Sequence, residues 1–277
     1  MTTVTCGLCP HGCALGEGQI GRCKARSNRD GRIVSDNYGV VTALSLDPIE
    51  KKPLNRFHPG GMVLSVGSFG CNLSCPFCQN HHISMNRPET IDPTRAMKPE
   101  ELVEKALELR SRGNIGLAFT YNEPLVGYEF VYDCAALASR AGLLNVLVTN
   151  GYINRAPLRE LLPYIHAMNI DLKSAGKEFY ASLGGDPDTV KETILEASAV
   201  CHVEITTLIV PGENDTEEEI LEIARWLASV DKDIPYHISR FFPRWRMSDM
   251  APTPVSKIYT LAAAARRYSR YVYEGNC

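Results

Sequence analysis

The chain has 277 residues, of which 44% are hydrophobic and 22% are charged, and its formal net charge is -3. This composition is that of a globular protein with one large domain and a small appendage, and the low net charge provides no basic field for a nucleic-acid partner. The N-terminus has no signal-peptide pattern and no apolar run reaches about 18 residues, so we expect a cytoplasmic protein with no membrane partner.

Four cysteines stand close together near the N-terminus, in the spacing Cys-x2-Cys-x3-Cys-x9-Cys. In a reducing cytoplasm such a group indicates metal binding rather than disulfides. Four thiolates saturate a metal, so we expect a closed site, either structural zinc or an auxiliary 4Fe-4S cluster, and the spacing does not choose between them. We therefore predict a small Cys-rich metal-binding module over residues 1–60 and a core over residues 61–277. The ligands of the module are Cys6, Cys9, Cys13 and Cys23.

From residue 62 onward, short β-branched runs alternate with longer helical patterns, which is typical of repeated βα units around a parallel sheet. Six such units predict an α/β fold, a partial (β/α)6 TIM-like barrel. Residues 216–219 have the form of a helix capping box, and the Pro-rich stretch 85–98 is expected to form a loop over the barrel mouth. The predicted strands are 62–68, 115–120, 144–149, 167–172, 202–210 and 236–241, and the predicted helices are 99–112, 128–141, 156–162, 188–200, 216–230 and 254–269.

Three further cysteines, Cys71, Cys75 and Cys78, directly follow the first predicted strand, at the end where βα barrels place their chemistry. Three thiolates on one loop can bind three irons of a 4Fe-4S cluster and leave the fourth iron open for the amino and carboxylate groups of S-adenosylmethionine (SAM). The Phe77 ring would shield this cluster from water. The alternative is a structural zinc site completed by a nearby histidine, either His81 or His82.

The Cys-x3-Cys-x2-Cys spacing, with an aromatic residue before the last cysteine, resembles the hallmark of the radical SAM superfamily. The whole chain resembles the radical enzyme of the AmmeMemoRadiSam system, a relative of pyruvate formate-lyase activating enzymes. The resemblance implies cleavage of SAM to a 5'-deoxyadenosyl radical, hydrogen abstraction from an unidentified substrate, a ferredoxin- or flavodoxin-like electron donor, and Memo-like and AMMECR1-like partners. It runs through residues 6–13, 28–31, 47–54, 70–80, 121–124 and 239–241.

Polar residues at the ends of three predicted strands are candidates for cofactor binding. Residues 121–124 resemble the segment that grips the amino group of SAM in this superfamily, which assigns Asn122 and Glu123 to that group, although Glu123 also suits a helix N-terminus. Asn150 could reach the ribose, or form a turn with the glycine after it. Asp171 and Lys173 share one face of a strand and resemble a pair at the cofactor site of activating enzymes, while an ordinary ion pair is the alternative.

The last predicted strand carries His237 and Arg240, which we expect near the barrel mouth as a ring for adenine and a cation for a carboxylate. A structural role is the alternative for His237. The remaining cysteines, Cys134, Cys201 and Cys277, stand alone and receive no role.

Two other functions compete with the radical enzyme of the AmmeMemoRadiSam type. One is an activating enzyme that abstracts hydrogen from a glycine of a partner enzyme. Such activases often lack an N-terminal Cys-rich module, which this chain has. The other is a noncatalytic zinc-binding adaptor, in which both groups of cysteines are structural.

Overall fold

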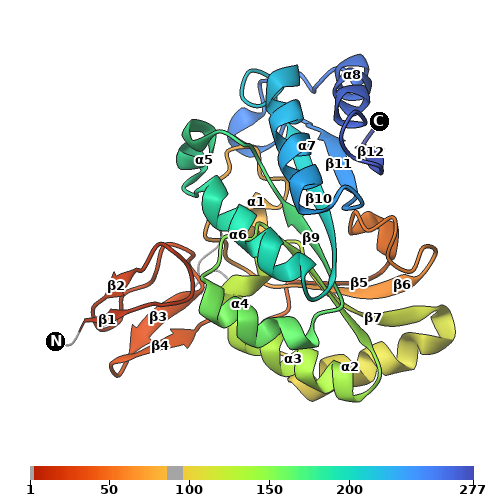
Figure 1. Cartoon of the computed structure of the whole chain (residues 1–277). Coiled ribbons are helices and arrows are strands. Elements are labelled where there is room, and N and C mark those ends of the chain that lie inside the picture. Colours follow the sequence, from red (N-terminus) through yellow and green to blue (C-terminus); the bar gives the residue numbers. More distant parts are fainter. Residues whose placement is uncertain (1–2, 86–95) are drawn as a thin grey trace.

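An eight-stranded sheet organises the chain in the computed structural model, which describes residues 3–85 and 96–277 (Figure 1). The strand order is β12-β11-β10-β9-β8-β7-β6-β5, so the sheet is open, with β12 and β5 as its edges. Only β5 runs antiparallel to its neighbour. The strands are β5 (Ala43–Pro48), β6 (Met62–Gly67), β7 (Asn114–Phe119), β8 (Leu144–Thr149), β9 (Ala167–Asp171), β10 (His202–Ile209), β11 (Tyr236–Arg240) and β12 (Val272–Gly275).

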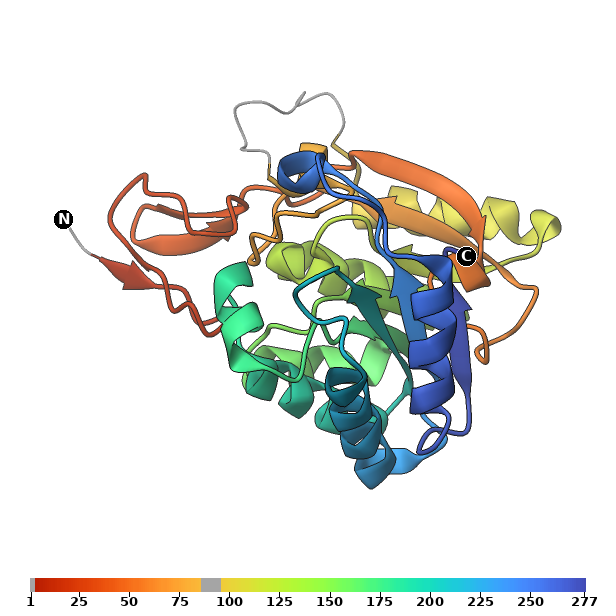
Figure 2. The same cartoon turned by 90° about the horizontal axis from the view of Figure 1, so that it is seen from above.

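Helices connect the parallel strands and cover the outer face of the sheet, as expected for a partial barrel (Figures 1 and 2). The predicted strands are confirmed with ends within about one residue, and the predicted helices with ends within about four. Of the strands and α-helices from β5 onward, the sequence did not predict β5, β12, the short helix α1 (His81–Ser84) or the helix α5 (Lys177–Leu183). The other helices are α2 (Pro99–Glu108), α3 (Tyr128–Arg140), α4 (Arg155–Leu161), α6 (Pro187–Ser198), α7 (Glu217–Asp231) and α8 (Val255–Ala265).

The capping box predicted at α7 forms only in part. Thr216 caps the helix, because its hydroxyl accepts a hydrogen bond from the Glu219 amide at 3.2 Å. The Glu219 carboxylate accepts hydrogen bonds instead from the Ser174 hydroxyl and the Ala175 amide, both at 2.6 Å. Glu219 therefore anchors the loop that follows β9. The predicted loop 85–98 falls largely on residues 86–95, which lie outside the described residues.

The N-terminal residues form two small antiparallel pairs, β1 (Val4–Thr5) with β2 (Ala14–Leu15) and β3 (Arg26–Arg29) with β4 (Arg32–Ser35). Both views place these strands to one side of the barrel (Figures 1 and 2). The sequence assigned residues up to 60 to this module, but β5 pairs with β6 along its whole length and belongs to the main sheet. The division into two domains remains a prediction.

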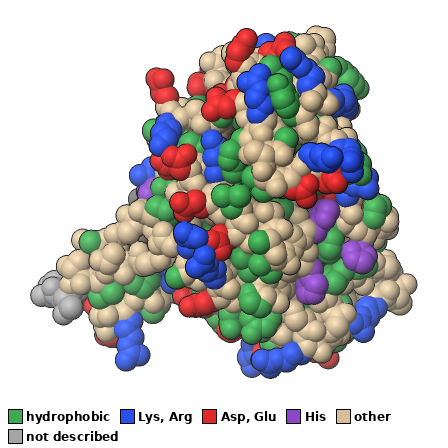
Figure 3. All heavy atoms as spheres, in the orientation of Figure 1, with side chains coloured by type: hydrophobic (Ala, Val, Ile, Leu, Met, Phe, Trp, Pro, Cys, Tyr) green, Lys and Arg blue, Asp and Glu red, His purple; other side chains and the backbone are tan. Residues whose placement is uncertain are grey.

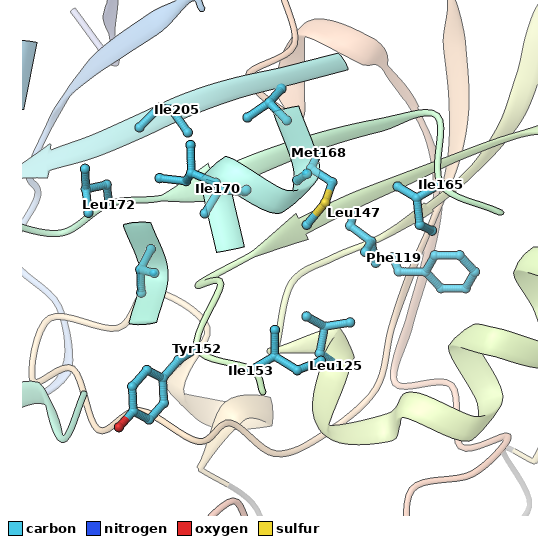
Figure 4. Close-up of a cluster of buried hydrophobic side chains, with 14 of the residues drawn as sticks. Phe119, Leu125, Leu147, Tyr152, Ile153, Ile165, Met168, Ile170, Leu172 and Ile205 are labelled. Carbon is cyan, nitrogen blue, oxygen red and sulfur yellow. The ribbon is translucent and has the colours of Figure 1, made fainter. Parts of the chain in front are cut away.

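The strands are buried on both faces, so alternate residues enter two different cores. Met168 and Ile170 of β9 and Leu172 just after it belong, with Phe119 of β7 and Leu147 of β8, to one cluster of buried side chains on the outer, helix-covered face of the sheet (Figure 4). The residues between them face the barrel interior. This alternation decides which polar side chains at the strand ends can reach the pocket described below.

The loop after β5 fills the barrel interior at the end opposite the strands' carboxyl ends. Ile49 and Leu54 are fully buried against inward-facing residues of β6 to β9. These partners are Val63, Ala118, Val146 and Ala167. The interior is therefore packed at this end, and space for a ligand remains at the other.

A buried ion pair joins β5 to the loop that fills the barrel interior. Lys52 is 4% exposed, and its ammonium group lies 2.9 Å from the Asp47 carboxylate, which also accepts a hydrogen bond from the Tyr121 hydroxyl at 2.8 Å. Burial opposes the charge on Asp47, but Lys52 and Tyr121 outweigh this effect and hold the pKa of that carboxyl well below its usual range. The Lys52 ammonium also lies over the Tyr121 ring, 4.7 Å from its centroid.

Glu204 of β10 connects the loop after β5 to the sheet. Its fully buried carboxylate accepts hydrogen bonds from the amides of Asn55 and Arg56, at 3.0 and 2.8 Å. It also lies 2.9 Å from His202 Nε2 and 2.6 Å from His237 Nε2. Burial opposes ionisation, but the two histidines outweigh it and lower the pKa of Glu204 to about 2.

We expect Glu204→Gln to destabilise the protein by about 2 to 4 kcal/mol, because the amide cannot satisfy four donors at a buried site. The lowered pKa means that ionised Glu204 stabilises the fold above about pH 4.5, and this contribution is lost as the pH falls toward 2. Urea unfolding at several pH values measures both effects. Glu196→Gln is the control, because Glu196 pairs with Arg155 and Arg159 at the surface and should contribute little. Equal losses in the two variants would contradict the anchoring role of Glu204.

Side chains of both charge signs intermingle on the face of the molecule in Figure 3. Over residues 3–85 and 96–277, no helix has the length and apolarity needed to cross a bilayer.

Candidate functional site

The loop after β6 carries Cys71, Cys75 and Cys78, and all three line one pocket of about 310 Å³ at the carboxyl ends of the strands. The loop begins at Gly70, whose φ of 90° favours glycine. A Cβ atom there would also come within 2.7 Å of the Cys23 carbonyl oxygen. Glycine thus lets the N-terminal module approach the start of the cysteine loop.

Hydrogen bonds to three other elements hold the cysteine loop in place. The Ser74 amide donates to the Leu183 carbonyl at 2.8 Å. The Asn72 side chain donates to the Tyr152 carbonyl at 2.7 Å, and the Asn80 side chain donates to the Tyr121 carbonyl at 2.8 Å. The thiols are therefore presented by a fixed backbone, as a preorganised site requires.

The three thiols suit a cluster better than a single ion. Burial raises the pKa of Cys71 well above its ordinary value and that of Cys75 to about 11, so their thiolates need a nearby cation. Among the described residues, no three His, Cys, Asp or Glu side chains are arranged around one ion. A 4Fe-4S cluster fits these observations, because each thiolate binds a different iron. Of the two histidines of the zinc alternative, His81 lies with Nδ1 3.2 Å from the Cys78 carbonyl oxygen and stacks on Trp245.

Glu123 is 3% exposed and lines the same pocket. Its carboxylate accepts hydrogen bonds from the Thr149 hydroxyl at 2.7 Å, the Asn150 amide at 2.8 Å and the Leu125 amide at 3.0 Å. The last of these caps the short 3-10 helix η5 (Pro124–Gly127), so the alternative reading of Glu123 as a helix N-terminal acid is confirmed, while its role toward SAM stays a prediction. Burial raises the pKa of Glu123 to about 7 despite these hydrogen bonds.

Asn122 and Asn150 also line the pocket, and both hold the cysteine loop. The Asn122 side chain accepts a hydrogen bond from the Ser68 amide at 2.9 Å and donates to the Gly70 carbonyl at 3.1 Å. The Asn150 side-chain amide lies 3.6 Å from Cys71 Sγ and 2.9 Å from the Asn72 side-chain oxygen. These two residues therefore hold the start of the cysteine loop and also line the pocket.

Asp171 and Lys173 leave β9 on the pocket side, and their charged groups lie 2.7 Å apart. The Lys173 side chain is only 13% exposed. Burial opposes its charge, but Asp171 outweighs this effect and raises the pKa of Lys173. The pair therefore brings a cation and a partly exposed carboxylate to the wall of the pocket.

Phe77 is 4% exposed and packs against Phe179, Leu183 and Phe241. Its ring also lines the pocket. The predicted apolar shield beside Cys75 and Cys78 is therefore in place, and it lowers the access of water to the thiols.

The structure does not bring His237 and Arg240 to the pocket, which corrects the expected placement. His237 faces the barrel interior, but it lies nearer the amino-terminal end of β11 than the pocket does. There it contacts Glu204, and its ring stacks on Tyr273. Arg240 points away from the interior and donates to the Thr253 carbonyl at 2.6 Å. The pocket-facing residue of β11 is Ser239, because side chains alternate along a strand.

Sequence reasoning missed several residues that line the pocket. Tyr121 adopts a φ of 75°, which is uncommon for a residue with a bulky side chain. Thr206 and Ser239 face inward at alternate positions of their strands, a signal that the strand pattern contained. Asn276 reaches the pocket from the segment after β12, and no sequence signal indicated this.

The four N-terminal cysteines, Cys6, Cys9, Cys13 and Cys23, line one small cavity of their own. Burial raises the pKa of Cys9, and it raises that of Cys23 to about 11. These thiols are not arranged around a single ion in the part of the chain that the structure describes.

The open parallel barrel, with a cysteine loop at the carboxyl ends of its strands, defines an iron–sulfur enzyme of the partial-barrel type. The chain belongs to the radical SAM superfamily, whose family model matches residues 65–227. It is therefore a SAM-cleaving enzyme by family, and its superfamily implies a 4Fe-4S cluster and SAM as cofactors.

Two curated relatives illustrate its neighbours in sequence. The uncharacterized protein MJ0808 of Methanocaldococcus jannaschii is 39% identical over 276 residues, which cover 99% of this chain and 81% of the relative. The pyruvate formate-lyase-activating enzyme of Clostridium pasteurianum is 27% identical over 180 residues, which cover 61% of this chain and 72% of that enzyme. The chain is thus related to glycyl-radical activating enzymes.

Solved structures show the same fold. A domain of the pyruvate-formate lyase-activating enzyme from Bacteroides vulgatus matches with a TM-score of 0.50 and 21% identity, over 58% of this chain and 99% of that domain. Streptococcus suis SuiB bound to S-adenosylmethionine matches with a TM-score of 0.56 and 14% identity, over 78% of this chain and 49% of SuiB.

Proposed function

We propose that Cys71, Cys75 and Cys78 hold a 4Fe-4S cluster, and that the adjoining pocket binds SAM and places it for hydrogen abstraction from a substrate. The observation that carries this proposal is that three cysteines of one loop face the same pocket as Glu123 and Lys173. When bound and reduced, the cluster supplies the electron that converts SAM to methionine and a 5'-deoxyadenosyl radical.

The side chains of the pocket have distinct roles in this proposal. Glu123 accepts hydrogen bonds from the ammonium group of SAM, because a buried carboxylate is a strong partner for a cation. Lys173, held by Asp171, offers a counter-charge to a carboxylate. Phe77 limits water near the thiols. His237 and Arg240 have no part in it, because neither lines the pocket.

We expect Glu123→Gln to weaken SAM binding by about 1.5 to 3 kcal/mol, roughly ten- to hundredfold in Kd, because a charge-assisted hydrogen bond is lost. Titration calorimetry of the anaerobic, cluster-loaded protein measures this change. Thr149→Val is the matched control, since it removes one hydrogen bond to Glu123 and keeps the charge. Unchanged affinity in Glu123→Gln would remove this residue from the SAM site.

We propose an enzyme of the AmmeMemoRadiSam type, acting in the cytoplasm with a ferredoxin- or flavodoxin-like donor and with Memo-like and AMMECR1-like partners. The supporting observation is the combination of the N-terminal cysteines with the motifs at residues 47–54 and 121–124. Deuterated candidate substrates test it, because hydrogen abstraction carries deuterium into 5'-deoxyadenosine. Transfer from a Memo-like or AMMECR1-like protein, or from a molecule that it binds, is the expected result. Its absence with all of them would contradict this assignment.

A glycyl-radical activating enzyme is the second candidate, favoured by relatives that are named pyruvate formate-lyase-activating enzymes, at 24 to 27% identity. It predicts a stable glycyl radical on a partner enzyme, visible by electron paramagnetic resonance. Incubation of the reduced protein with SAM and a pyruvate formate-lyase tests this candidate directly. Appearance of the radical would favour the activase over the AmmeMemoRadiSam type.

A further inference from the structure

The two groups of cysteines are in direct contact through the backbone. The amide of Cys71, the first residue of the catalytic triplet, donates a hydrogen bond to the carbonyl of Cys23 at 3.1 Å. On the next residue, the Asn72 carbonyl oxygen lies 2.8 Å from His11 Nε2. Gly70 allows this approach, because any larger residue would meet the Cys23 carbonyl. One hydrogen bond thus joins a residue of each group.

The cavity of the N-terminal cysteines combines apolar walls with one buried arginine. Leu8, Leu15 and Val126 line it together with the four thiols, and Arg26, whose two terminal nitrogens donate to the Glu129 carboxylate at 2.7 Å, also lies at its wall. Arg26 is 7% exposed, and among the described residues its Nε has no hydrogen-bond partner. A buried, unpartnered N–H at the wall of a tetrathiolate site is a donor for sulfur ligands.

The arrangement of the thiols distinguishes between the two centres that the sequence left open. A structural zinc site places its four ligands around one ion at about 2.3 Å. No three side chains of the described residues have such an arrangement, although all four cysteines face one cavity. A 4Fe-4S cluster holds its thiolates farther apart, each on its own iron, so four cysteines that share a cavity without surrounding a single point favour the cluster.

We propose that Cys6, Cys9, Cys13 and Cys23 bind a second 4Fe-4S cluster that passes electrons to the cluster on Cys71, Cys75 and Cys78 through the Cys23–Cys71 contact. This inference rests on the proposed function, which supplies the electron acceptor. A low-potential one-electron protein donor reduces the N-terminal cluster, which then returns to its oxidised state as the catalytic cluster gains the same electron. No bond forms or breaks in this transfer, and no proton moves.

Metal content of the full chain, reconstituted anaerobically with iron and sulfide, tests the site itself. We expect about eight irons per chain in the wild type, and about four in both the Cys9→Ala/Cys13→Ala variant and the Cys71→Ala/Cys75→Ala/Cys78→Ala variant. After reduction, SAM should change the paramagnetic signal of the Cys9/Cys13 variant and leave that of the triple variant unchanged. Zinc or no metal on the module of the triple variant overturns the proposal, even where the other variant does not fold.

Reduction kinetics test the relay. With reduced flavodoxin as donor, the Cys9→Ala/Cys13→Ala variant should lose the fast reduction of the catalytic cluster seen in the wild type. With titanium(III) citrate, a small reductant that needs no relay, the same variant should still cleave SAM. Equal rates with flavodoxin in the wild type and the variant overturn the relay. Intact SAM in the wild type with titanium(III) citrate refutes the proposed function instead, so the two failures are distinguishable.

Discussion

Cys75→Ala should abolish the release of 5'-deoxyadenosine while the barrel stays folded. The loss of one of three thiolates leaves the catalytic cluster under-ligated and labile. The loop is fixed by hydrogen bonds to other elements, such as that from the Ser74 amide to the Leu183 carbonyl, and not by the Cys75 side chain alone. Iron content, circular dichroism and product analysis by chromatography measure the three expected results.

Cys201→Ala is the control for this experiment, because Cys201 is half-buried and lies outside both cysteine groups. We expect it to keep its iron and its activity. A Cys75→Ala protein that forms product at the wild-type rate would show that this thiol is no ligand.

Lys52→Met should cost about 3 to 5 kcal/mol of the free energy of unfolding, because it leaves the Asp47 carboxylate buried without its cation. Lys51→Met is a matched control from the next position. Lys51 lies 3.5 Å from the same carboxylate, but its side chain is 68% exposed, so its removal should cost little. Urea unfolding of both variants measures the difference.

The Lys52→Met variant should also bind SAM less tightly, since Asp47 and Lys52 hold the Tyr121 side chain, which lines the pocket. Equal stability of the two lysine variants would contradict the buried ion pair.

The barrel was predictable because apolar residues recur with different periods in its strands and its helices, and both kinds of segment are long enough to show the difference. The edge strands were not. β5 ends in proline and lies within residues 1–60, which were assigned as a whole to the Cys-rich module. β12 spans only four residues, with three of them half-buried, and such a short strand has no periodic signal.

The site was predictable where chemistry depends on spacing along one segment. The three cysteines, Glu123 and the Asp171–Lys173 pair line one pocket, as the motifs indicated. The prediction misplaced His237 and Arg240. The register of β11 decides which of its residues face inward and how far along the barrel axis they lie, and this register depends on pairing with the neighbouring strands. The contact between Cys23 and Cys71 joins residues far apart in sequence, so only the structure could place it.

Product analysis of the wild-type protein tests the central claim most directly. The chain is reconstituted anaerobically with iron and sulfide, then incubated with SAM and titanium(III) citrate. The account predicts 5'-deoxyadenosine and methionine in equal amounts, and neither product when the reductant is left out. SAM that stays intact in the reduced protein, while Cys71, Cys75 and Cys78 hold their cluster, would contradict it.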